Sequence, residues 1–477
     1  MKFSDLYDGG RIAAGGLRDF AAGFVSPALR LGVTGLSRSG KTVFITALVQ
    51  ALLKGGRLPA FEAMAQGRIT RVFLEPQPDD DLPRFAYEDH LAALEGKDRH
   101  WPEGTKRISQ LRLTIEYEPR GFIARNMGRG RLHVDIVDYP GEWLLDLPLM
   151  KMSYAEWSAQ TVAASKVEPR LSRAAEWHAH LRTLDAMAPA DETAAMAAAG
   201  IFTSYLASCR DDDISMSALP PGRFLMPGDF AGSPLLAFAP LDVSPSLFFP
   251  RGSLGALMER RYDSYVAKIV KPFFFGHFSR LDRQIVLVDA LTALNAGASA
   301  VKDLQAALTQ ILTCFRQGSN SLISSLLGHR IDRILFAATK ADLLHHTSHD
   351  KLEAILKLIV SDAMDRAEYS GATLDVTALA AIRATREASV KQKGETLDCI
   401  AGIPQAGESI GTTQFDGETE AAIFTGDLPD DPRAALDGSL EGHLRFLRFR
   451  PPQPKDGRFP HIRMDRAIEF LMGDRLA

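Results

Sequence analysis

Cysteine is scarce in this 477-residue sequence. The cysteines are odd in number, lie far apart and match no metal or redox motif, so we expect core thiols in a reducing compartment. They are Cys209, Cys314 and Cys399. No run approaches the roughly 18 uninterrupted apolar residues of a membrane span, and the charged first dozen residues do not resemble a signal peptide. The sequence therefore predicts a cytoplasmic protein, or one held at the inner membrane through a partner.

A strong charge of either sign is also missing. Lysine and arginine number 55 against 59 aspartates and glutamates, which gives a formal net charge of −4. This balance gives no reason to expect a nucleic-acid partner. The 46% hydrophobic and 24% charged content is typical of a soluble globular protein. The length predicts roughly two to four structural units.

The stretch that organises the chain is residues 35–42, G-L-S-R-S-G-K-T, which fits the phosphate-loop motif G-x-x-x-x-G-K-[ST]. An apolar run at 29–33 predicts a strand before it, and 43–53 predicts a helix after it. In that context the backbone N–H groups and the helix N-terminus face phosphates, Lys41 reaches the β- and γ-phosphates, and Thr42 binds Mg²⁺. A glycine-rich loop with an accidental lysine is the alternative. The predicted nucleotide-binding residues here are Gly35, Ser37, Arg38, Ser39, Gly40, Lys41, Thr42 and Val43.

Residues 111–117 and 132–136 alternate between apolar and polar side chains and predict two neighbouring strands. The second leads into Asp138-Tyr139-Pro140-Gly141, a D-x-x-G motif. Asp138 can hold Mg²⁺ through water beside the phosphate-loop hydroxyl, and the Gly141 N–H can sense a γ-phosphate. Alone, D-x-x-G is more often a turn. Its position after a phosphate loop and at the end of a strand favours a nucleotide-sensing switch segment over a simple turn.

Two continuous apolar runs, 285–289 and 334–338, predict strands buried on both faces. The second runs into Thr339-Lys340-Ala341-Asp342, which resembles the guanine-reading N-K-x-D motif. The Asp342 carboxylate would accept from the ring N–H and the exocyclic amine of guanine, and the Lys340 stem would pack on the base. Thr339 departs from the usual asparagine, and a surface loop is the alternative. After a last strand at 375–381, Ala384 and Thr385 are further nucleotide-binding candidates.

Strands that alternate with helices predict an α/β fold, a doubly wound and mostly parallel sheet of a P-loop GTPase domain, with a helical insertion and a small β-rich insertion. Residues 56–104 are rich in proline and read as a long excursion outside the core. We place the first part of the GTPase domain at 1–145, with an extended switch region at 56–104, a mostly helical inserted domain at 146–280, the second part at 281–386, the β-rich insertion at 387–455 and a returning C-terminal helix at 456–477.

Three other clusters invite a functional interpretation. Asp211-Asp212-Asp213 reads as a solvated loop rather than a metal site, and the phenylalanines at 273–275 with Phe278 as buried packing rather than a partner surface. The spacing of His345, His346 and His349 allows two imidazoles on one helix face, as in some metal sites. No cysteine or glutamate partner is evident in the sequence, so a helix start near the base pocket is the favoured interpretation.

Taken together, V-T-G-L-S-R-S-G-K-T, D-Y-P-G-E-W, I-V-L-V-D-A-L, T-K-A-D and A-x-I-R-A-T-R-E resemble the YcjX family of bacterial P-loop proteins over essentially the whole chain. The resemblance implies GTP/GDP and Mg²⁺ as cofactors, a guanine nucleotide as the bound partner and a kinship with translation-factor-related GTPases. It also implies a membrane-protein partner of the YcjF type and a role in membrane or phage-shock stress.

The GTPase pattern suggests further roles. A threonine before the second strand completes the Mg²⁺ shell, and Thr105 fits that place, which gives Thr42, Thr105 and Asp138 as metal ligands. Glu142 stands where Ras-like GTPases carry a glutamine, which puts a Ras-like water mechanism in doubt. Arg38 resembles the arginine finger supplied in cis by interferon-induced guanylate-binding proteins, which implies a nucleotide-dependent homodimer; an arginine facing solvent or a carboxylate is the alternative. The catalytic candidates are Arg38, Lys41, Thr105, Gly141 and Glu142.

The sequence thus predicts a slow, regulatory GTPase. Two alternatives stay open: an ATPase or nucleoside-kinase-like transferase, and a scaffold that binds nucleotide without useful turnover. Competition between guanine and adenine nucleotides distinguishes the GTPase from the ATPase or transferase. Measurable turnover distinguishes the GTPase from the scaffold.

Overall fold

The computed structural model describes residues 28–36, 38–120, 129–211, 215–315, 331–368, 371–392, 395–438 and 440–477. Ser37, Asp212 and Asp213, named above, lie outside these ranges. Cys209 and Cys399 are buried and unbridged, as expected of core thiols. Within the described ranges, no helix is both long enough and apolar enough to cross a membrane.

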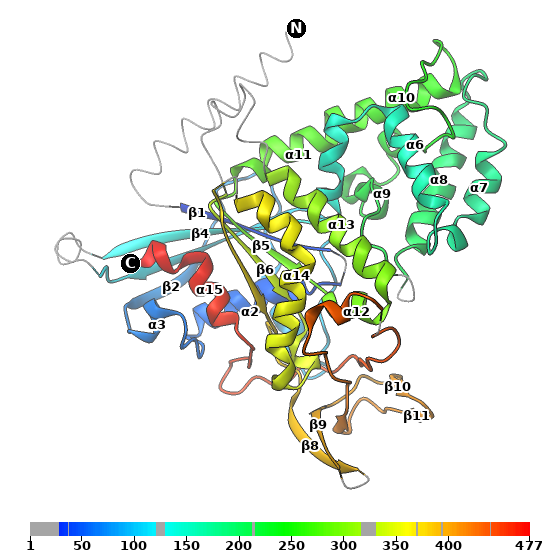
Figure 1. Cartoon of the computed structure of the whole chain (residues 1–477). Coiled ribbons are helices and arrows are strands. Elements are labelled where there is room, and N and C mark those ends of the chain that lie inside the picture. The colour runs from blue at the N-terminus through cyan, green and yellow to red at the C-terminus, as the bar shows by residue number, and fades with distance from the viewer. Residues whose placement is uncertain are drawn as a thin grey trace.

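A seven-stranded sheet forms the centre of the molecule, in the order β2-β3-β4-β1-β5-β6-β7 (Figure 1). Neighbouring strands from β4 to β7 in this order run parallel, whereas β3 is antiparallel to both β4 and β2. The predicted mostly parallel α/β fold is therefore confirmed. The strands are β1 (Ala28–Gly35), β2 (Ile69–Glu75), β3 (Ser109–Tyr117), β4 (Gly130–Asp138), β5 (Arg283–Val288), β6 (Arg333–Ala338) and β7 (Thr373–Ala378).

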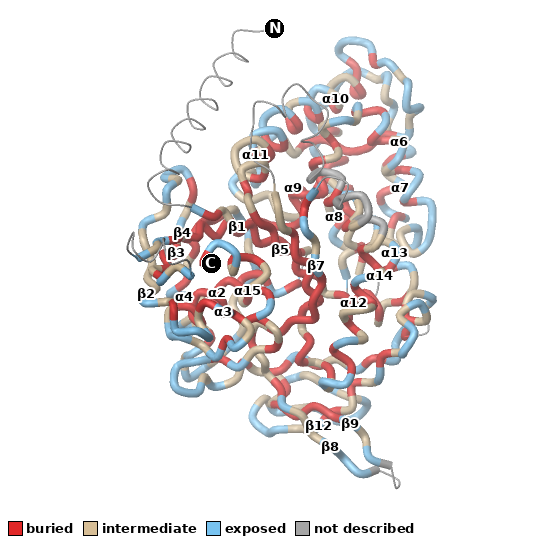
Figure 2. The backbone as a smooth tube through the Cα atoms, turned by 60° about the vertical axis from the view of Figure 1, so that its left-hand side comes forward, coloured by how far each residue is buried: buried red, intermediate tan, exposed pale blue. Residues whose placement is uncertain are grey.

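Helices cover both faces of this sheet, which explains the continuous apolar runs. In β5, Ile285 and Leu287 enter the core shared with α2, while Val286 and Val288 enter the core shared with α13 and α14. Figure 2 shows the resulting band of buried residues through the centre of the molecule. The helices concerned are α2 (Lys41–Leu53) and the returning α15 (Met464–Met472) on one face, and α12 (Ala290–Asn295), α13 (Ala298–Phe315) and α14 (His349–Glu368) on the other.

The expectation that residues 56–104 lie outside the core is wrong. This stretch contains α3 (Glu62–Ala65), the edge strand β2 and α4 (Tyr87–Glu95). Its apolar side chains join the core of β1 and α2. Sequence reasoning missed β2 because none of its residues is fully buried, so no apolar side chain has to alternate with a polar one. The buried side chains are Leu58, Phe61, Phe85, Tyr87 and Leu94.

A helical body lies beside the sheet, at the upper right in Figure 1. Its aromatic core includes Trp157, Trp177 and Phe202 and continues without a break to Tyr139 and Trp143 at the end of β4. Phe273, Phe274 and Phe278 are buried, so the packing interpretation of that cluster is confirmed. The helices are α6 (Tyr154–Ser165), α7 (Ala175–Leu181), α8 (Glu192–Ser208), α9 (Gly222–Leu225), α10 (Leu254–Tyr265) and α11 (Lys271–Gly276).

A small antiparallel sheet of order β12-β9-β8 follows the last strand of the main sheet and projects below it in Figure 1. A two-stranded ribbon, β10-β11, lies beside it. The β-rich insertion has a small core of its own, formed by Ile400, Ile423, Leu447 and Phe449. The strands are β8 (Arg386–Gln392), β9 (Glu395–Gly402), β10 (Ser409–Ile410), β11 (Thr413–Gln414) and β12 (Ala421–Ile423).

Candidate functional site

The loop between β1 and α2 is shaped by its glycines. A Cβ at Gly35 would lie 2.2 Å from Ser39 Oγ and 2.6 Å from the Leu287 carbonyl oxygen, so no larger residue fits there. Gly40 has a φ of 82°, in the left-handed region, and caps α2 without a side-chain hydrogen bond. The first N–H groups of α2 therefore have no capping side chain, which is the arrangement that suits an anion.

Two side chains of this loop are directed inward. Lys41 is buried, and its Nζ donates to the Gly35 carbonyl at 3.2 Å, so the ammonium lies inside the loop. Ser39 is buried, and its Oγ has no hydrogen-bond partner among the described residues. Arg38, in contrast, is exposed and has a φ of 63°. The loop thus combines an inward lysine, an inward hydroxyl and an outward arginine within four residues.

The three predicted metal ligands meet at the end of β4. Thr105 Oγ1 donates to Asp138 Oδ2 at 2.6 Å, and the Thr42 and Thr105 hydroxyl oxygens are 3.5 Å apart. Asp138 Oδ1 is buried and has no hydrogen-bond partner among the described residues. Burial raises the pKa of Asp138 to about 6, against the opposing effects of the Lys41 charge and the Thr105 hydrogen bond. Two hydroxyls and a carboxylate with an unsatisfied oxygen are hard oxygen donors that fit Mg²⁺.

Gly141 and Glu142 follow directly on this cluster. A Cβ at Gly141 would lie 2.4 Å from the Gly35 carbonyl oxygen, so Gly141 packs against the phosphate loop itself. Glu142 is buried, and its Oε1 lies 3.3 Å from Arg210 Nη2 of the helical body. In this arrangement the Glu142 carboxylate is engaged by the helical body.

The T-K-A-D segment closes the same edge of the sheet. The Thr339 N–H and hydroxyl both donate to the Val288 carbonyl, at 2.9 and 3.3 Å, which fastens the end of β6 to the end of β5. Lys340 has a φ of 61°, and its Nζ lies 2.5 Å from Asp289 Oδ2. Asp289 was missed as a functional candidate, although a carboxylate directly after a buried strand was the available signal.

Asp342 is brought together with the last two sequence candidates. The Ala384 N–H donates to Asp342 Oδ2 at 2.9 Å, and the Thr385 hydroxyl donates to the Asp342 carbonyl. Burial raises the pKa of Asp342 to about 6, although the Ala384 hydrogen bond favours the ionised form. The 384–385 segment, 42 residues downstream, therefore holds both the carboxylate and the main chain of Asp342 in place.

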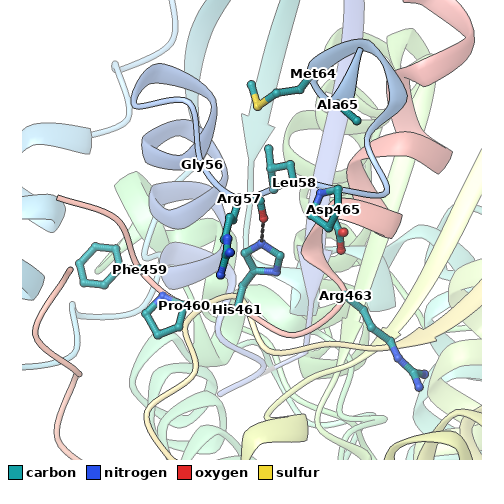
Figure 3. A pocket seen from close by; sticks show the side chains of 11 residues that line it. Gly56, Arg57, Leu58, Met64, Ala65, Phe459, Pro460, His461, Arg463 and Asp465 are labelled. Carbon is teal, nitrogen blue, oxygen red and sulfur yellow. Dashed lines mark hydrogen bonds between the residues drawn. The ribbon is translucent and has the colours of Figure 1, made fainter. Parts of the chain in front are cut away.

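A separate cavity of about 730 Å³ lies at the opposite end of α2, between the 56–65 segment and the chain before α15 (Figure 3). Thirteen helical residues place it about 20 Å from the phosphate loop. His461 lines it and pairs with the Arg57 carbonyl at 2.8 Å, while Arg463 is engaged with Glu353 at 2.7 Å. This cavity is not part of the predicted nucleotide site.

The phosphate loop follows β1, Asp138 ends β4, and the T-K-A-D segment follows β6, so all of these groups lie at the carboxyl ends of parallel strands. Open α/β sheets bind ligands at that edge. The fold and this arrangement define a P-loop domain of the GTPase type that carries insertions.

The chain belongs to the YcjX-like family (DUF463), whose model matches residues 29–476. It is 38% identical over 462 residues to a protein of Escherichia coli named "Ras-like GTPase YcjX", an alignment that covers 94% of this chain and 96% of the relative. It is 36% identical over 477 residues to a protein of the same name from Shewanella oneidensis, covering 94% of each.

Proposed function

We propose that the protein binds guanine nucleotides with Mg²⁺ and hydrolyses GTP slowly to GDP and phosphate, as a regulatory switch. The observation that carries this proposal is the meeting of a phosphate loop, the Thr42–Thr105–Asp138 cluster and Asp342 along one edge of the sheet. The names of its relatives as GTPases support it.

In this proposal the phosphate groups lie against the N-terminus of α2, and Lys41 exchanges the Gly35 carbonyl for phosphate oxygens. Thr42, Thr105 and Asp138 hold Mg²⁺, which neutralises charge on the β- and γ-oxygens when bound. The Gly141 N–H, packed on the phosphate loop, reads the terminal phosphate. The protein therefore contributes positioning and charge stabilisation, which are the main requirements of phosphoryl transfer.

The base would be recognised by Asp342, since a carboxylate accepts from both the ring N–H and the amine of guanine, whereas adenine offers no such pair. Asp289 holds the Lys340 ammonium, so the Lys340 stem is available to pack on the base. Thr339 departs from the usual asparagine, but its N–H and hydroxyl both bond to the end of β5. A threonine can thus supply a tether for the recognition loop.

Calorimetric titration with GDP and with ADP, in Mg²⁺, tests this proposal. We expect tight GDP binding by the wild type, weak ADP binding, and a loss of GDP affinity of about 100-fold in Asp342→Ala, because two hydrogen bonds to a charged group are lost. Equal affinities for the two nucleotides, indifferent to Asp342, would move the function to ATP or to general nucleotide binding. Binding without measurable GTP hydrolysis would favour the scaffold.

In this proposal the two insertions report the nucleotide state. This role is supported by contacts between each insertion and one of the segments expected to respond to the nucleotide. Four residues before Thr105, Trp101 Nε1 donates to the Phe449 carbonyl of the β-rich insertion at 2.7 Å. Arg99 Nε donates to the Pro451 carbonyl at 3.2 Å, and Arg450 donates to the Lys97 carbonyl at 3.1 Å. Movement of Thr105 on Mg²⁺ binding would therefore pull on this insertion.

The segment after Gly141 is joined as closely to the helical body. Trp143 Nε1 donates to the Met226 carbonyl at 3.0 Å, and the Arg223 guanidinium lies 3.1 Å from the centre of the Trp143 ring. The Gly222 N–H donates to Asp146 Oδ1 at 2.6 Å, and a Cβ at Gly222 would lie 2.0 Å from the Glu142 carbonyl oxygen. Contacts this close mean that Glu142 cannot move without disturbing α9.

Hydrogen exchange should reveal this coupling. Between the complexes with GDP and with a non-hydrolysable GTP analogue, we expect different protection of amides in residues 222–226 and 447–451, because their contacts are made by the two nucleotide-responsive segments. The matched internal control is α7, which lies in the helical body away from these contacts and should exchange equally in both states. If each of the three segments exchanges equally in the GDP complex and in the complex with the GTP analogue, the insertions do not report the nucleotide state.

From the family resemblance we further propose a membrane-protein partner of the YcjF type, attachment to the inner membrane through it, a cytoplasmic location otherwise, and a role in membrane or phage-shock stress. The Arg38 comparison adds a nucleotide-dependent homodimer. The unit boundaries set out above, 1–145, 146–280, 281–386, 387–455 and 456–477, belong to the same proposal.

A further inference from the structure

Two adjacent histidines meet a glutamate from the β-rich insertion. His345 and His346 lie between the T-K-A-D segment and α14, and Glu387 is the second residue of β8. Glu387 Oε2 lies 2.9 Å from His345 Nε2 and 3.3 Å from His346 Nδ1. One ligand atom from each of the three side chains lies within 4.8 Å of the others. The glutamate partner that sequence reasoning did not find is therefore present, 41 residues downstream.

His349, the third histidine of the sequence pattern, does not take part. It is buried, and its Nε2 faces the Leu344 carbonyl oxygen at 3.3 Å. The site is thus formed by residues from two elements and not by the helical spacing of the histidines.

Two further polar atoms of the cluster, one on His345 and one on Glu387, are also engaged. His345 Nδ1 lies 3.0 Å from Thr347 Oγ1 and 3.5 Å from Asp398 Oδ2 of β9. Glu387 Oε1 accepts from Arg383 Nη2 at 2.5 Å. A metal-bound histidine characteristically gives its second ring nitrogen to a carboxylate or other oxygen, which fixes the tautomer and the ring orientation. His345 has such outer partners already in place.

We propose that His345, His346 and Glu387 bind Zn²⁺ or a similar divalent transition-metal ion. Two imidazoles and one carboxylate are a common zinc ligand set, with the fourth position open to water. Tetrahedral ligands at about 2.1 Å from zinc stand roughly 3.4 Å from one another, which the cluster reaches with small side-chain adjustments. An ion pair between a histidine and Glu387 explains these contacts less well. Both imidazole rings, whose centroids are 4.3 Å apart, approach the same oxygen of the Glu387 carboxylate.

The position of the site gives it a structural consequence. His345 follows Asp342 by three residues, and the chain leading into β8 supplies the Ala384 N–H and Thr385 hydroxyl that bond to Asp342. A metal ion would fasten β8 to the loop that carries Asp342. The proposal does not depend on guanine binding, because metal binding is measured without nucleotide.

The test uses the full-length protein without a histidine tag, stripped of metal and titrated with Zn²⁺ against a chromophoric competing chelator. We expect one equivalent per chain. Loss of an outer partner costs about 10- to 100-fold in metal affinity, and Asp398→Asn should weaken Zn²⁺ binding within that range. His346→Ala and Glu387→Gln each remove a proposed ligand and should weaken Zn²⁺ binding by more than this. His443→Ala, an exposed histidine elsewhere, is the matched control and should bind like the wild type.

Cobalt substitution provides a second readout. Co²⁺ in a four-coordinate site of this kind absorbs strongly in the visible region, and we expect that absorption in the wild type and its loss in Glu387→Gln. His346 has 64% of its side chain exposed, so its replacement leaves the fold intact, which thermal unfolding of the metal-free variants verifies. Absence of stoichiometric binding at micromolar free Zn²⁺, or affinity unchanged in both His346→Ala and Glu387→Gln, would overturn the proposal.

Discussion

Replacement of Asp342 by asparagine should change the nucleotide preference of the protein from guanine to xanthine. The Ala384 N–H requires an acceptor at the position of Asp342 Oδ2, so the amide oxygen of asparagine takes that place and the amide NH₂ faces the base. On guanine that NH₂ meets the exocyclic amine, which is also a donor. Xanthine carries a carbonyl in place of this amine and accepts from the NH₂, while the amide oxygen can accept from the ring N–H that both bases share. We expect GDP affinity to fall roughly 100-fold or more, and xanthosine diphosphate to bind the variant more tightly than GDP does.

Competition of the two diphosphates against a fluorescent nucleotide measures this exchange. Asp375→Asn, the same substitution at an exposed aspartate in β7, is the matched control and should leave both affinities unchanged. If xanthosine diphosphate gains nothing in Asp342→Asn, then Asp342 does not contact the base, and the assignment of T-K-A-D as the base reader is wrong.

The parts of the fold that the sequence predicted are those with local causes. The phosphate loop needs glycines at fixed offsets between a strand and a helix, and buried parallel strands need continuous apolar runs, so both leave a pattern within about ten residues. The sequence also indicated Thr42, Thr105 and Asp138 as one cluster, and the structure places their side chains together. Their role in metal binding stays a prediction.

The parts that the sequence did not predict depend on contacts between distant segments. Glu387 joins His345 across 42 residues, and Arg210 joins Glu142 across 68. Neither contact has a fixed spacing that a motif could record, because the intervening elements set the distance in space. The edge strand β2 was not predicted for another reason. It has a neighbouring strand on one side only and none of its side chains is fully buried, so its sequence carries no apolar pattern.

Replacement of Arg38 by asparagine should slow single-turnover GTP hydrolysis about a thousandfold, while nucleotide affinity changes only a few-fold. An arginine placed on the transferring phosphate is worth about 10³ to 10⁵ in rate. Arg38 lies in the phosphate loop with an exposed side chain, and its φ of 63° is uncommon for a residue with a side chain. Strained residues of this kind gather at functional sites.

The choice of substitution decides what this experiment measures. Alanine at φ 63° would strain the phosphate loop and weaken nucleotide binding for a reason unrelated to catalysis, whereas asparagine tolerates the left-handed region. Arg38→Lys keeps the positive charge but not the planar pair of donors, so its rate should fall between the wild type and Arg38→Asn. The rate is measured with the protein in excess over GTP, at protein concentrations high enough to bind all of the GTP. A rate in Arg38→Asn equal to that of the wild type would exclude the arginine finger and leave charge stabilisation to Lys41 and the metal site.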